Sequence, residues 1–316
     1  MKLSAIPLAL IVCLSAFAQQ KKPGTSVEIS YGGTLLSLQE NKARVCYVDK
    51  LKGISGEGYQ GMEVYGDTVL SAQNSGWLSV YTYNGEQLKQ IVAPYKMDCY
   101  DKVNHSNVVS LSNYRYEKSD PLPLLYVSQC ARQPWQGMKD VLFVERIAPD
   151  LKSTQTVQTI YFKDIAHLFG YALQWVVDRD NDMLYGYGNT IDNENKANKH
   201  RIVKFRLPKW NEGENGLLVL TEADLLENYL LEDTYNCSFM PIGQGLFVHR
   251  GQLFMPTGFG SADHPSVLYV WNLQTRSMQN VIDLSRSTFS ELEDCALWRG
   301  SLLLQAQGHL FSLTNL

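Results

Sequence analysis

Five polar residues, spread along most of this sequence, form its best candidate for a ligand-binding set. Amide side chains and a neutral imidazole can each donate and accept hydrogen bonds, whereas a glutamate is normally anionic. A ring of such groups suits a polar, largely uncharged ligand, such as a sugar or a peptide. The alternative is that the groups only bond one another and water, as buried polar groups must. The set is Gln60, His105, Gln174, Gln244 and Glu293.

Alternating carboxylates at residues 178–182 (Asp-Arg-Asp-Asn-Asp) are the pattern closest to a metal site. Oxygen ligands at such spacing can surround Ca²⁺, but a complete calcium loop also needs Gly at its sixth position and Glu at its twelfth. Met183 and Asn189 stand there instead. A polar turn between two strands is therefore the favoured interpretation.

Catalytic motifs are not apparent in the sequence. The six histidines form none of the paired spacings that bind zinc, and neither a Gly-x-Ser-x-Gly elbow nor a Gly-rich phosphate loop is present. Many glycosidases use two separated carboxylates, and Glu63, Glu293 and Asp294 are the acids expected near strand starts. Solvation or a turn explains each acid as well as catalysis does. We therefore expect no metal and no cofactor, and whether the protein is an enzyme stays open.

The positions of these candidate residues depend on a repeated unit of four short strands. The unit is clearest over residues 60–92. Turn signals stand at residues 66–67, 74–76 and 84–85, and the last is Asn-Gly, a strong two-residue hairpin signal. Four antiparallel strands of this length make one blade of a β-propeller.

The same pattern of apolar residues around a turn recurs at one register. Residues 64–70, 248–254 and 297–303 each read as apolar, turn, apolar, which indicates one repeated unit. The candidate ligand set stands where the innermost strand of each repeat begins, with Gln174 one position along. Because innermost strands begin at one mouth of a propeller's central channel, we expect the set to converge in a polar funnel there.

The sequence predicts an all-β fold, in which residues 27–316 form one domain, a five-bladed propeller. The last repeat is one strand short, so we expect residues 27–38 to close it as an outer strand. Six blades are the alternative, if residues 44–48 and their neighbours form a further sheet. A short inserted helix is expected over residues 222–231, after a cap at Thr221.

Loops and one outer strand complete the expected layout. Residues 216–220 are the expected fourth strand of the third repeat. Trp135 and Trp210 fall in loops, where an aromatic ring can support a sugar or a peptide. Long polar loops that we expect to rim a channel mouth are residues 112–123, 130–139 and 188–199.

The first residues read as an export signal. A positive start precedes an apolar segment at residues 5–17, and residues 16–18 (Ala-Phe-Ala) form a small-x-small cleavage site. Residues 1–18 are then a signal peptide and residues 19–26 a linker. We expect the mature protein in the periplasm or outside the cell.

Cysteine positions bear on the same compartment. A lipoprotein anchor on Cys13 is disfavoured, because Val12 precedes it where a small residue is normally required. An exported chain permits disulfides, and Cys99 with Cys130 is the pairing to test first. For most of the cysteines, a role as small buried apolar residues is favoured.

The net charge and hydropathy of the chain limit the classes of partner that it is expected to bind. The formal net charge is −4 and Lys and Arg form no run, which argues against nucleic acid and anionic membrane surfaces. No stretch is long and apolar enough for a membrane span. The expected partner is a small polar ligand, a glycan or a peptide.

The repeat architecture, with phrases such as Pro-Leu-Leu-Tyr-Val-Ser at residues 123–128, resembles exported bacterial propeller proteins loosely related to the TolB-like propellers. The resemblance covers most of the mature chain and implies the propeller fold. It brings no catalytic residue with it, because propellers host binding proteins, hydrolases and lyases alike.

Two functions follow from these patterns. The favoured one is an exported ligand-binding or interaction propeller with a polar central funnel, because no acid pair, triad or metal cluster is visible. The alternative is a propeller hydrolase or lyase that acts on a polysaccharide or other polar substrate in the same funnel.

Overall fold

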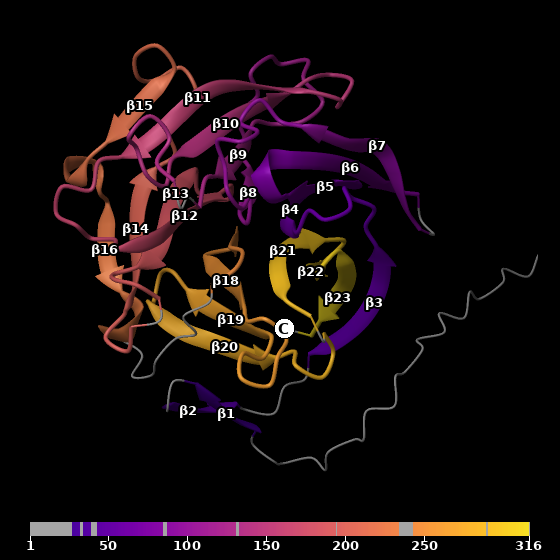
Figure 1. Ribbon diagram of the computed structural model, residues 1–316, viewed down its shortest axis with the longest axis vertical. Coiled ribbons are helices and arrows are strands. Elements are labelled where there is room, and N and C mark those ends of the chain that lie inside the picture. The colour runs from indigo at the N-terminus through magenta and orange to yellow at the C-terminus, as the bar shows by residue number, and fades with distance from the viewer. Residues whose placement is uncertain are drawn as a thin grey trace, which may run out of the picture.

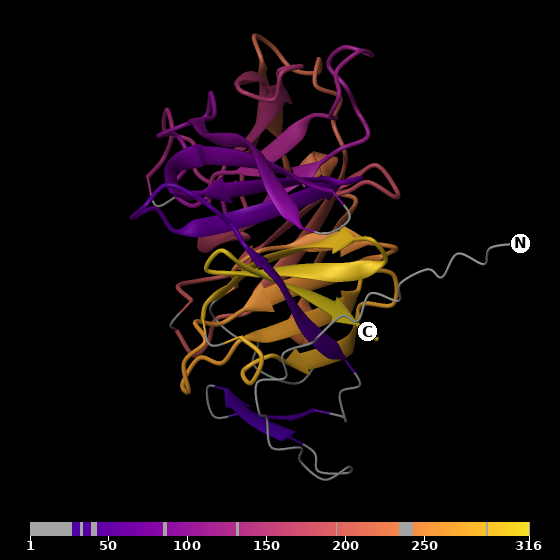
Figure 2. The same cartoon turned by 90° about the vertical axis from the view of Figure 1, so that its right-hand side faces the viewer.

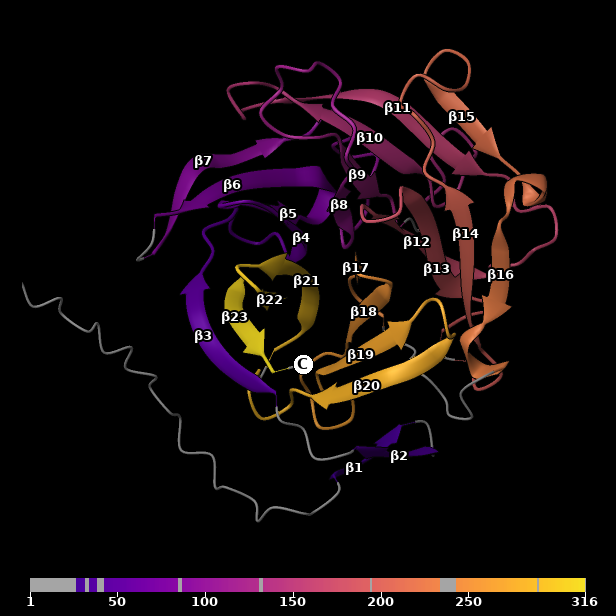
Figure 3. The ribbon, with the colours of Figure 1, turned by 180° about the vertical axis from the view of Figure 1, so that it is seen from behind.

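The computed structural model describes residues 27–31, 34–38, 43–84, 87–130, 133–193, 195–233, 243–288 and 290–315. Within these residues nearly all regular structure is β-strand (Figure 1). Five sheets of four or five strands are arranged around one axis, so the fold is a five-bladed β-propeller, as the repeats predict. Figure 3 shows the same ring of blades from behind.

We number the blades in the order of their innermost strands. Blade 1 contains β4 (Tyr59–Tyr65), β5 (Thr68–Gln73), β6 (Trp77–Tyr83) and β7 (Leu88–Lys96). Blade 2 contains β8 (Val109–Leu111), β9 (Leu125–Ser128), β10 (Leu142–Ile147), β11 (Thr154–Phe162) and β15 (Leu217–Leu220). Blade 3 contains β12 (Tyr171–Asp178), β13 (Met183–Asn189), β14 (His200–Arg206) and β16 (Glu227–Leu230).

The last two blades follow the same plan. Blade 4 contains β17 (Phe247–His249), β18 (Gln252–Thr257), β19 (Val267–Asn272) and β20 (Ser277–Asp283). Blade 5 contains β21 (Leu292–Trp298), β22 (Ser301–Ala306), β23 (His309–Thr314) and β3 (Arg44–Lys50).

The first hairpin of a blade shows why the repeats share one register. In blades 4 and 5 the turn residues are Arg250-Gly251 and Arg299-Gly300, and all four have positive φ. A two-residue hairpin of this kind requires positive φ at both central positions and matches the twist of the strands. The recurring apolar–turn–apolar pattern therefore reports a real structural repeat.

An N-terminal strand closes the ring, but it is not the predicted one. β3 (Arg44–Lys50) pairs antiparallel with β23 along its full length, from Thr314↔Arg44 to His309↔Lys50. Residues 27–38 instead form their own hairpin, β1 (Val27–Tyr31) with β2 (Thr34–Leu38), which lies outside the ring (Figure 2). A two-residue connection makes this local pairing easy to close. β3, which directly precedes blade 1 in the sequence, therefore completes blade 5.

The predicted helix over residues 222–231 is also wrong. Glu222–Asp224 forms a single 3-10 turn with the expected capping box between Thr221 and Asp224, and a second such turn, Leu231–Asp233, begins at the last residue of the range. Between these turns the chain extends into β16, which pairs with β14. Sheet pairing overrides the helical spacing of the leucines, because the outer edge of β14 would otherwise lie unpaired.

Residues 216–220 form a strand in a different blade from the expected one. β15 runs parallel to β11, with Thr159↔Leu217 and Phe162↔Leu220 in register. It therefore gives blade 2 a fifth strand, and β16 takes the outer position in blade 3.

The hydrophobic core lies between adjacent blades. Trp175 and Trp271 lie on strands and are fully buried. Trp175 packs with Tyr126 and Phe205 between blades 2 and 3, and its Nε1 donates to the carbonyl of Asp140 at 2.7 Å. Large flat side chains thus fill the wedges between radial sheets.

The pairing of Cys99 with Cys130 is not formed, because Cys99 is a free thiol. Cys99 is fully buried, and its role is that of a small apolar side chain. Cys237 lies outside the described residues, as do the predicted signal peptide and linker. Among the helices of the described residues, none has the length and apolar character to cross a membrane.

Candidate functional site

The five predicted ligand-binding residues lie on one face of the propeller, the face on which the innermost strands begin. We call this the strand-start face. Gln60, Gln174, Gln244 and Glu293 are between 1 and 9 % exposed, and His105 is half-buried. The axis at this face is therefore filled by polar side chains and their partners.

Irregular strand pairing places three of these residues. The ladders of β4, β12 and β21 each break register near their start, at Tyr59/Met62, Tyr171/Gln174 and Leu292/Asp294. Bulges of this type re-aim side chains and bend a strand. Gln60 lies within the break of β4 and Glu293 within the break of β21. Gln174 is the last residue of the break in β12. The same distortion therefore recurs in blades 1, 3 and 5.

Gln244 joins two blades through its main-chain carbonyl. That oxygen accepts hydrogen bonds from Asn107 Nδ2 at 2.8 Å and from Gln174 Nε2 at 3.0 Å. The side-chain Nε2 of Gln244 donates in turn to Glu291 Oε1 at 2.5 Å. Residues of blades 2 and 3 thus bind the same main-chain carbonyl, which belongs to the segment that leads into blade 4.

A second amide extends this network to Glu293. Gln307 Nε2 donates to Glu291 Oε2 and to Glu293 Oε1, both at 2.9 Å. The structure therefore brings three of the five predicted residues, Gln174, Gln244 and Glu293, into one connected network. Glu291 and Gln307 complete it and were missed, because nothing in their local sequence marks them.

Burial makes the two carboxyl groups of this network weak acids. It raises the pKa of Glu293 well above its usual value, and the nearby charges of Glu291 and Asp294 raise it further. Burial also raises the pKa of Glu291, which the amide donors of Gln244 and Gln307 partly offset. Both groups thus keep a proton to higher pH than a solvated glutamate does.

Three buried side-chain oxygens in the network have no hydrogen-bond partner in the described part of the chain. They belong to Asn107 (Oδ1), Gln174 (Oε1) and Glu293 (Oε2), and their residues are at most 3 % exposed. A buried acceptor requires a donor, because its desolvation is otherwise uncompensated. The two amide oxygens, of Asn107 and Gln174, therefore need O–H or N–H groups from outside the described residues, which a ligand or water can supply.

Gln60 and His105 take different partners. The carbonyl of Gln60 accepts a hydrogen bond from Gln305 Nε2, whereas His105 Nδ1 lies 2.8 Å from Asn74 Oδ1. An added methyl group at Gly58 would contact both Asn74 and Gln60, so these two side chains border one spot. Gln60, Asn74 and His105 thus form a separate polar group near the start of blade 1.

The other two predicted acids, Asp294 and Glu63, accept hydrogen bonds from main-chain N–H groups. Asp294 accepts from the N–H groups of Met62 at 2.7 Å and Cys295 at 2.9 Å. Glu63 accepts from Leu111 N–H at 2.9 Å and lies 3.4 Å from Arg179 Nη2. Both carboxyl groups are fully buried, and burial raises the pKa of each. They tie the innermost strands of adjacent blades together.

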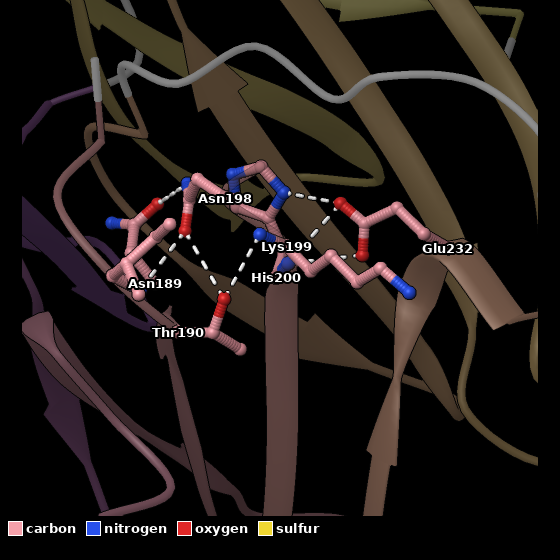
Figure 4. A network of polar contacts seen from close by, with 7 residues as sticks. Asn189, Thr190, Asn198, Lys199, His200 and Glu232 are labelled. Carbon is pink, nitrogen blue, oxygen red and sulfur yellow. Dashed lines mark hydrogen bonds and ion pairs between the residues drawn. The ribbon is translucent and has the colours of Figure 1, made fainter. Parts of the chain in front are cut away.

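A histidine–carboxylate pair lies next to the network in blade 3 (Figure 4). His200 Nδ1 is 2.7 Å from Glu232 Oε1, and the main-chain N–H of His200 donates to the same carboxylate. The imidazole stacks on Tyr187, with ring centroids 5.7 Å apart and planes 8° from parallel. Packing and hydrogen bonds therefore fix its orientation. Sequence reasoning missed this pair, because strand pairing alone brings Glu232 to His200.

A small cavity connects the two groups. It has a volume of about 30 Å³, and Gln174, Asn189, His200 and Gly243 are among the residues that line it. That volume is the share of about one water molecule. The cavity therefore admits a single small polar group, such as the tip of a bound ligand.

The predicted loops separate onto two faces. Residues 130–139 connect the end of β9 to the start of β10, and residues 188–199 connect β13 to β14, both on the strand-start face. Residues 112–123 follow the end of β8 and lie on the opposite face, which we call the strand-end face. Two of the three loops therefore surround the predicted site.

The acidic motif of residues 178–182 forms the hairpin between β12 and β13, as the turn interpretation predicts. Asp178 accepts hydrogen bonds from Asp180 N–H and Asn181 Nδ2, and Asp182 accepts from Asn113 Nδ2. The carboxylates thus hold the turn and its neighbouring loop in place.

Comparison with known proteins bears on the fold. No protein-family model matches the chain, and no curated protein matches it in sequence. A tail fibre of a Staphylococcus aureus phage superposes with a TM-score of 0.50 at 11% identity, covering 90% of this chain and 54% of that one. Glutaminyl cyclase of Myxococcus xanthus has a TM-score of 0.49 at 11% identity, with coverage of 85% and 95%.

A putative oxidoreductase (glucose dehydrogenase) of Thermus thermophilus has a TM-score of 0.44 at 12% identity, with coverage of 86% and 100%. Such identities show likeness of fold alone. By its own sheet topology the chain is a five-bladed β-propeller closed by an N-terminal strand.

Proposed function

We propose that this chain is a ligand-binding propeller that holds a small polar ligand, a glycan or a peptide segment, at the strand-start face. The ligand contacts Gln60, His105, Gln174, Gln244 and Glu293. One observation carries the proposal: two buried amide oxygens on this face, Asn107 Oδ1 and Gln174 Oε1, receive no donor from the described residues. Hydroxyl groups of a sugar or N–H groups of a peptide supply such donors.

The protonation state of the network favours an uncharged ligand. The raised pKa values of Glu291 and Glu293 reduce the negative charge that a bound molecule meets. Amide groups of Gln174 and Gln244 supply the rest of the lining. A neutral, hydroxyl-rich ligand is therefore better matched to this face than a strongly charged one.

Gln174→Ala tests the proposal. The substitution removes one amide side chain of the network without changing the charge. We expect affinity for neutral oligosaccharides and peptides to fall about fivefold to twentyfold, as it does when one buried hydrogen bond is lost. Gln279→Ala, on the exposed side of β20, is the matched control. Calorimetric titration should show loss in the first variant only. Equal binding in both variants, for every ligand that wild type holds, would remove the site.

A second function, a hydrolase or lyase on a polysaccharide or other polar substrate, is favoured by one observation, the His200–Glu232 pair. A histidine oriented by a carboxylate is the arrangement of a general base. If it acts so, His200→Ala and Glu232→Gln should lower turnover of a cleaved polysaccharide by at least about a hundredfold while binding persists. A wild-type chain that cleaves none of a broad panel would exclude this function.

Export is part of the same proposal. We propose that residues 1–18 are a signal peptide, that Gln19 is the mature N-terminus, and that the protein works in the periplasm or outside the cell. The Ala-Phe-Ala site at residues 16–18 supports this, as does the resemblance to exported TolB-like propellers. Intact-mass measurement on protein from the native host decides. Retention of residues 1–18, or a lipid on Cys13, would contradict it.

A further inference from the structure

A second cavity lies on the strand-end face, away from the proposed ligand site. It is formed between residues 112–123 and the loop that follows β14, and its volume is about 460 Å³. This is within the range of pockets that hold small ligands. Side chains that line it include Tyr114, Arg115, Lys118, Lys209 and Trp210.

The charged side chains that line the cavity are all cationic. Within the described residues, Arg115, Lys118 and Lys209 take part in no ion pair. Two nearby carboxylates, Asp120 and Glu212, also attract Arg115 and Lys209, but each forms its ion pair with an arginine outside the lining. Arg146 pairs with Asp120 at 2.8 Å, and Arg206 pairs with Glu212 at 2.6 Å. Three cations therefore face one cavity in a chain whose net charge is negative.

Buried contacts hold the lining in position. Gln158, which is 1 % exposed, donates from Nε2 to the carbonyls of Lys209 at 2.9 Å and Glu212 at 2.8 Å. The guanidinium of Arg115 donates to the carbonyl of Asp120 at 3.0 Å and to Tyr65 Oη at 3.1 Å. Because the loops are tied before a ligand arrives, little ordering cost remains on binding.

An aromatic ring forms part of the wall. Trp210 lines the cavity and packs against Tyr116, with ring centroids 4.4 Å apart. The Arg146 guanidinium lies 4.7 Å from the Tyr116 ring. The indole is thus braced by Tyr116. A braced, partly exposed indole beside cations offers an apolar ring face and charge together.

We propose that this cavity binds an acidic saccharide, in which a sugar ring lies against Trp210 and its carboxylate or sulfate group is held by Lys118, Lys209 and Arg115. Residues 112–123 contain no strand. An acidic peptide therefore finds no sheet edge there to pair with. The site is separate from the strand-start face, so either site can fail without the other.

Four probes define the ligand class: trigalacturonic acid, a heparin-derived tetrasaccharide, maltotetraose and tetraglutamate. Tryptophan fluorescence and calorimetry should detect binding of at least one acidic saccharide, with affinity that falls steeply as salt is raised. The first two probes distinguish a uronate from a sulfate ligand. Maltotetraose and tetraglutamate should bind at least about tenfold more weakly.

Lys209→Ala is the decisive variant, because its side chain is exposed and its loss leaves the loop contacts through Gln158 intact. The affinity for the bound acidic saccharide should fall about threefold to fivefold. Lys209→Glu should abolish it. Lys163→Ala, an exposed lysine beyond the end of β11 on the strand-start face, is the matched control and should change nothing.

Trp210→Phe tests the aromatic wall while keeping an aromatic partner for Tyr116. We expect about a threefold loss of affinity and unchanged thermal unfolding. The proposal is overturned if neither acidic saccharide binds, if tetraglutamate binds as tightly as they do, or if Lys209→Glu binds like wild type.

Discussion

At the residue scale, the axis is built from side chains that satisfy the main chain of the next blade. An innermost strand has no sheet partner on its axial side, so some of its N–H groups would remain unpaired. Ser110 Oγ accepts from the N–H of Val177 at 3.1 Å, and Ser128 Oγ accepts from that of Trp175 at 3.2 Å. The buried carboxyl group of Asp294 does the same for Met62.

Main chains also approach each other directly at the axis. The N–H of Gly61 donates to the carbonyl of Ser106 in the connection to blade 2 at 2.7 Å. A Cβ atom at Gly61 would lie 2.5 Å from that carbonyl oxygen and 2.9 Å from the nitrogen of Val109. Both are main-chain atoms, so they cannot turn aside as a flexible side chain could.

We therefore expect Gly61→Ala to lower the free energy of unfolding by about 1–3 kcal/mol, as overpacking does in a closely packed site. Urea denaturation followed by tryptophan fluorescence gives the value. Gly243→Ala is the control, because among the described residues a Cβ atom there meets Tyr187 alone, at 3.4 Å. Equal stability of the two variants would show that blades 1 and 2 can separate at no cost.

At the element scale, the closing strand decides whether the ring holds. β3 pairs over its full length with β23, whereas β1 and β2 pair with each other. Opening blade 5 would expose the main-chain groups of β23 and apolar side chains such as Leu310 and Leu313, which are now fully buried.

Two deletions separate these elements. Removal of residues 27–38 should leave the melting temperature within about 2 °C of the wild type, because the hairpin is outside the ring. Removal of residues 27–50 should lower it by at least about 8 °C, since a loss of several kcal/mol shifts the transition by that much in a chain of this size. Differential scanning calorimetry measures both. The reverse order of effects would contradict closure by β3.

At the scale of the whole molecule, the two faces carry candidate sites of different chemistry. The strand-start face holds amides and carboxyl groups with raised pKa values, among them Glu291 and Glu293. The strand-end face holds the cationic cavity of Arg115, Lys118 and Lys209. A propeller with two chemically different faces can hold two different ligands at once.

The buried acids also give the molecule a characteristic pH dependence. A carboxyl group whose pKa is raised by folding contributes stability that is present below its unfolded value, about 4.5 for glutamate, and is lost as the pH rises through its folded value. Glu293→Gln removes this loss at one site and keeps an acceptor for Gln307. The stability difference between variant and wild type should therefore grow in favour of the variant from about pH 4.5 upward.

Thermal unfolding of both proteins across acidic to mildly alkaline pH measures this difference. Groups with lowered pKa values, such as Asp120 and Glu212, are shared by the two proteins and cancel. Gln279→Ala serves as the control and should track the wild type at every pH. A constant difference between Glu293→Gln and wild type would mean that Glu293 titrates normally in the folded state.

Local chemistry was sufficient to predict the blades. Alternating apolar residues and two-residue turns at Gly66-Asp67, Arg250-Gly251 and Arg299-Gly300 determine each hairpin and its register, because strand pairing across a short turn depends on neighbours in sequence. The repeat of this signal favoured five blades over six, and the structure has five. It also placed the starts of the innermost strands, and with them four residues buried on one face: Gln60, Gln174, Gln244 and Glu293.

Only the tertiary structure decided what those residues meet. Glu291, Gln307 and Glu232 have no local signal, because their partners come from other strands or other blades. The same holds for β3, which closes the ring, and for β15, which joins blade 2. In both cases several strands of similar local sequence could pair with the open edge of a sheet. Such choices depend on contacts between distant parts of the chain, which form only when the blades assemble around the axis.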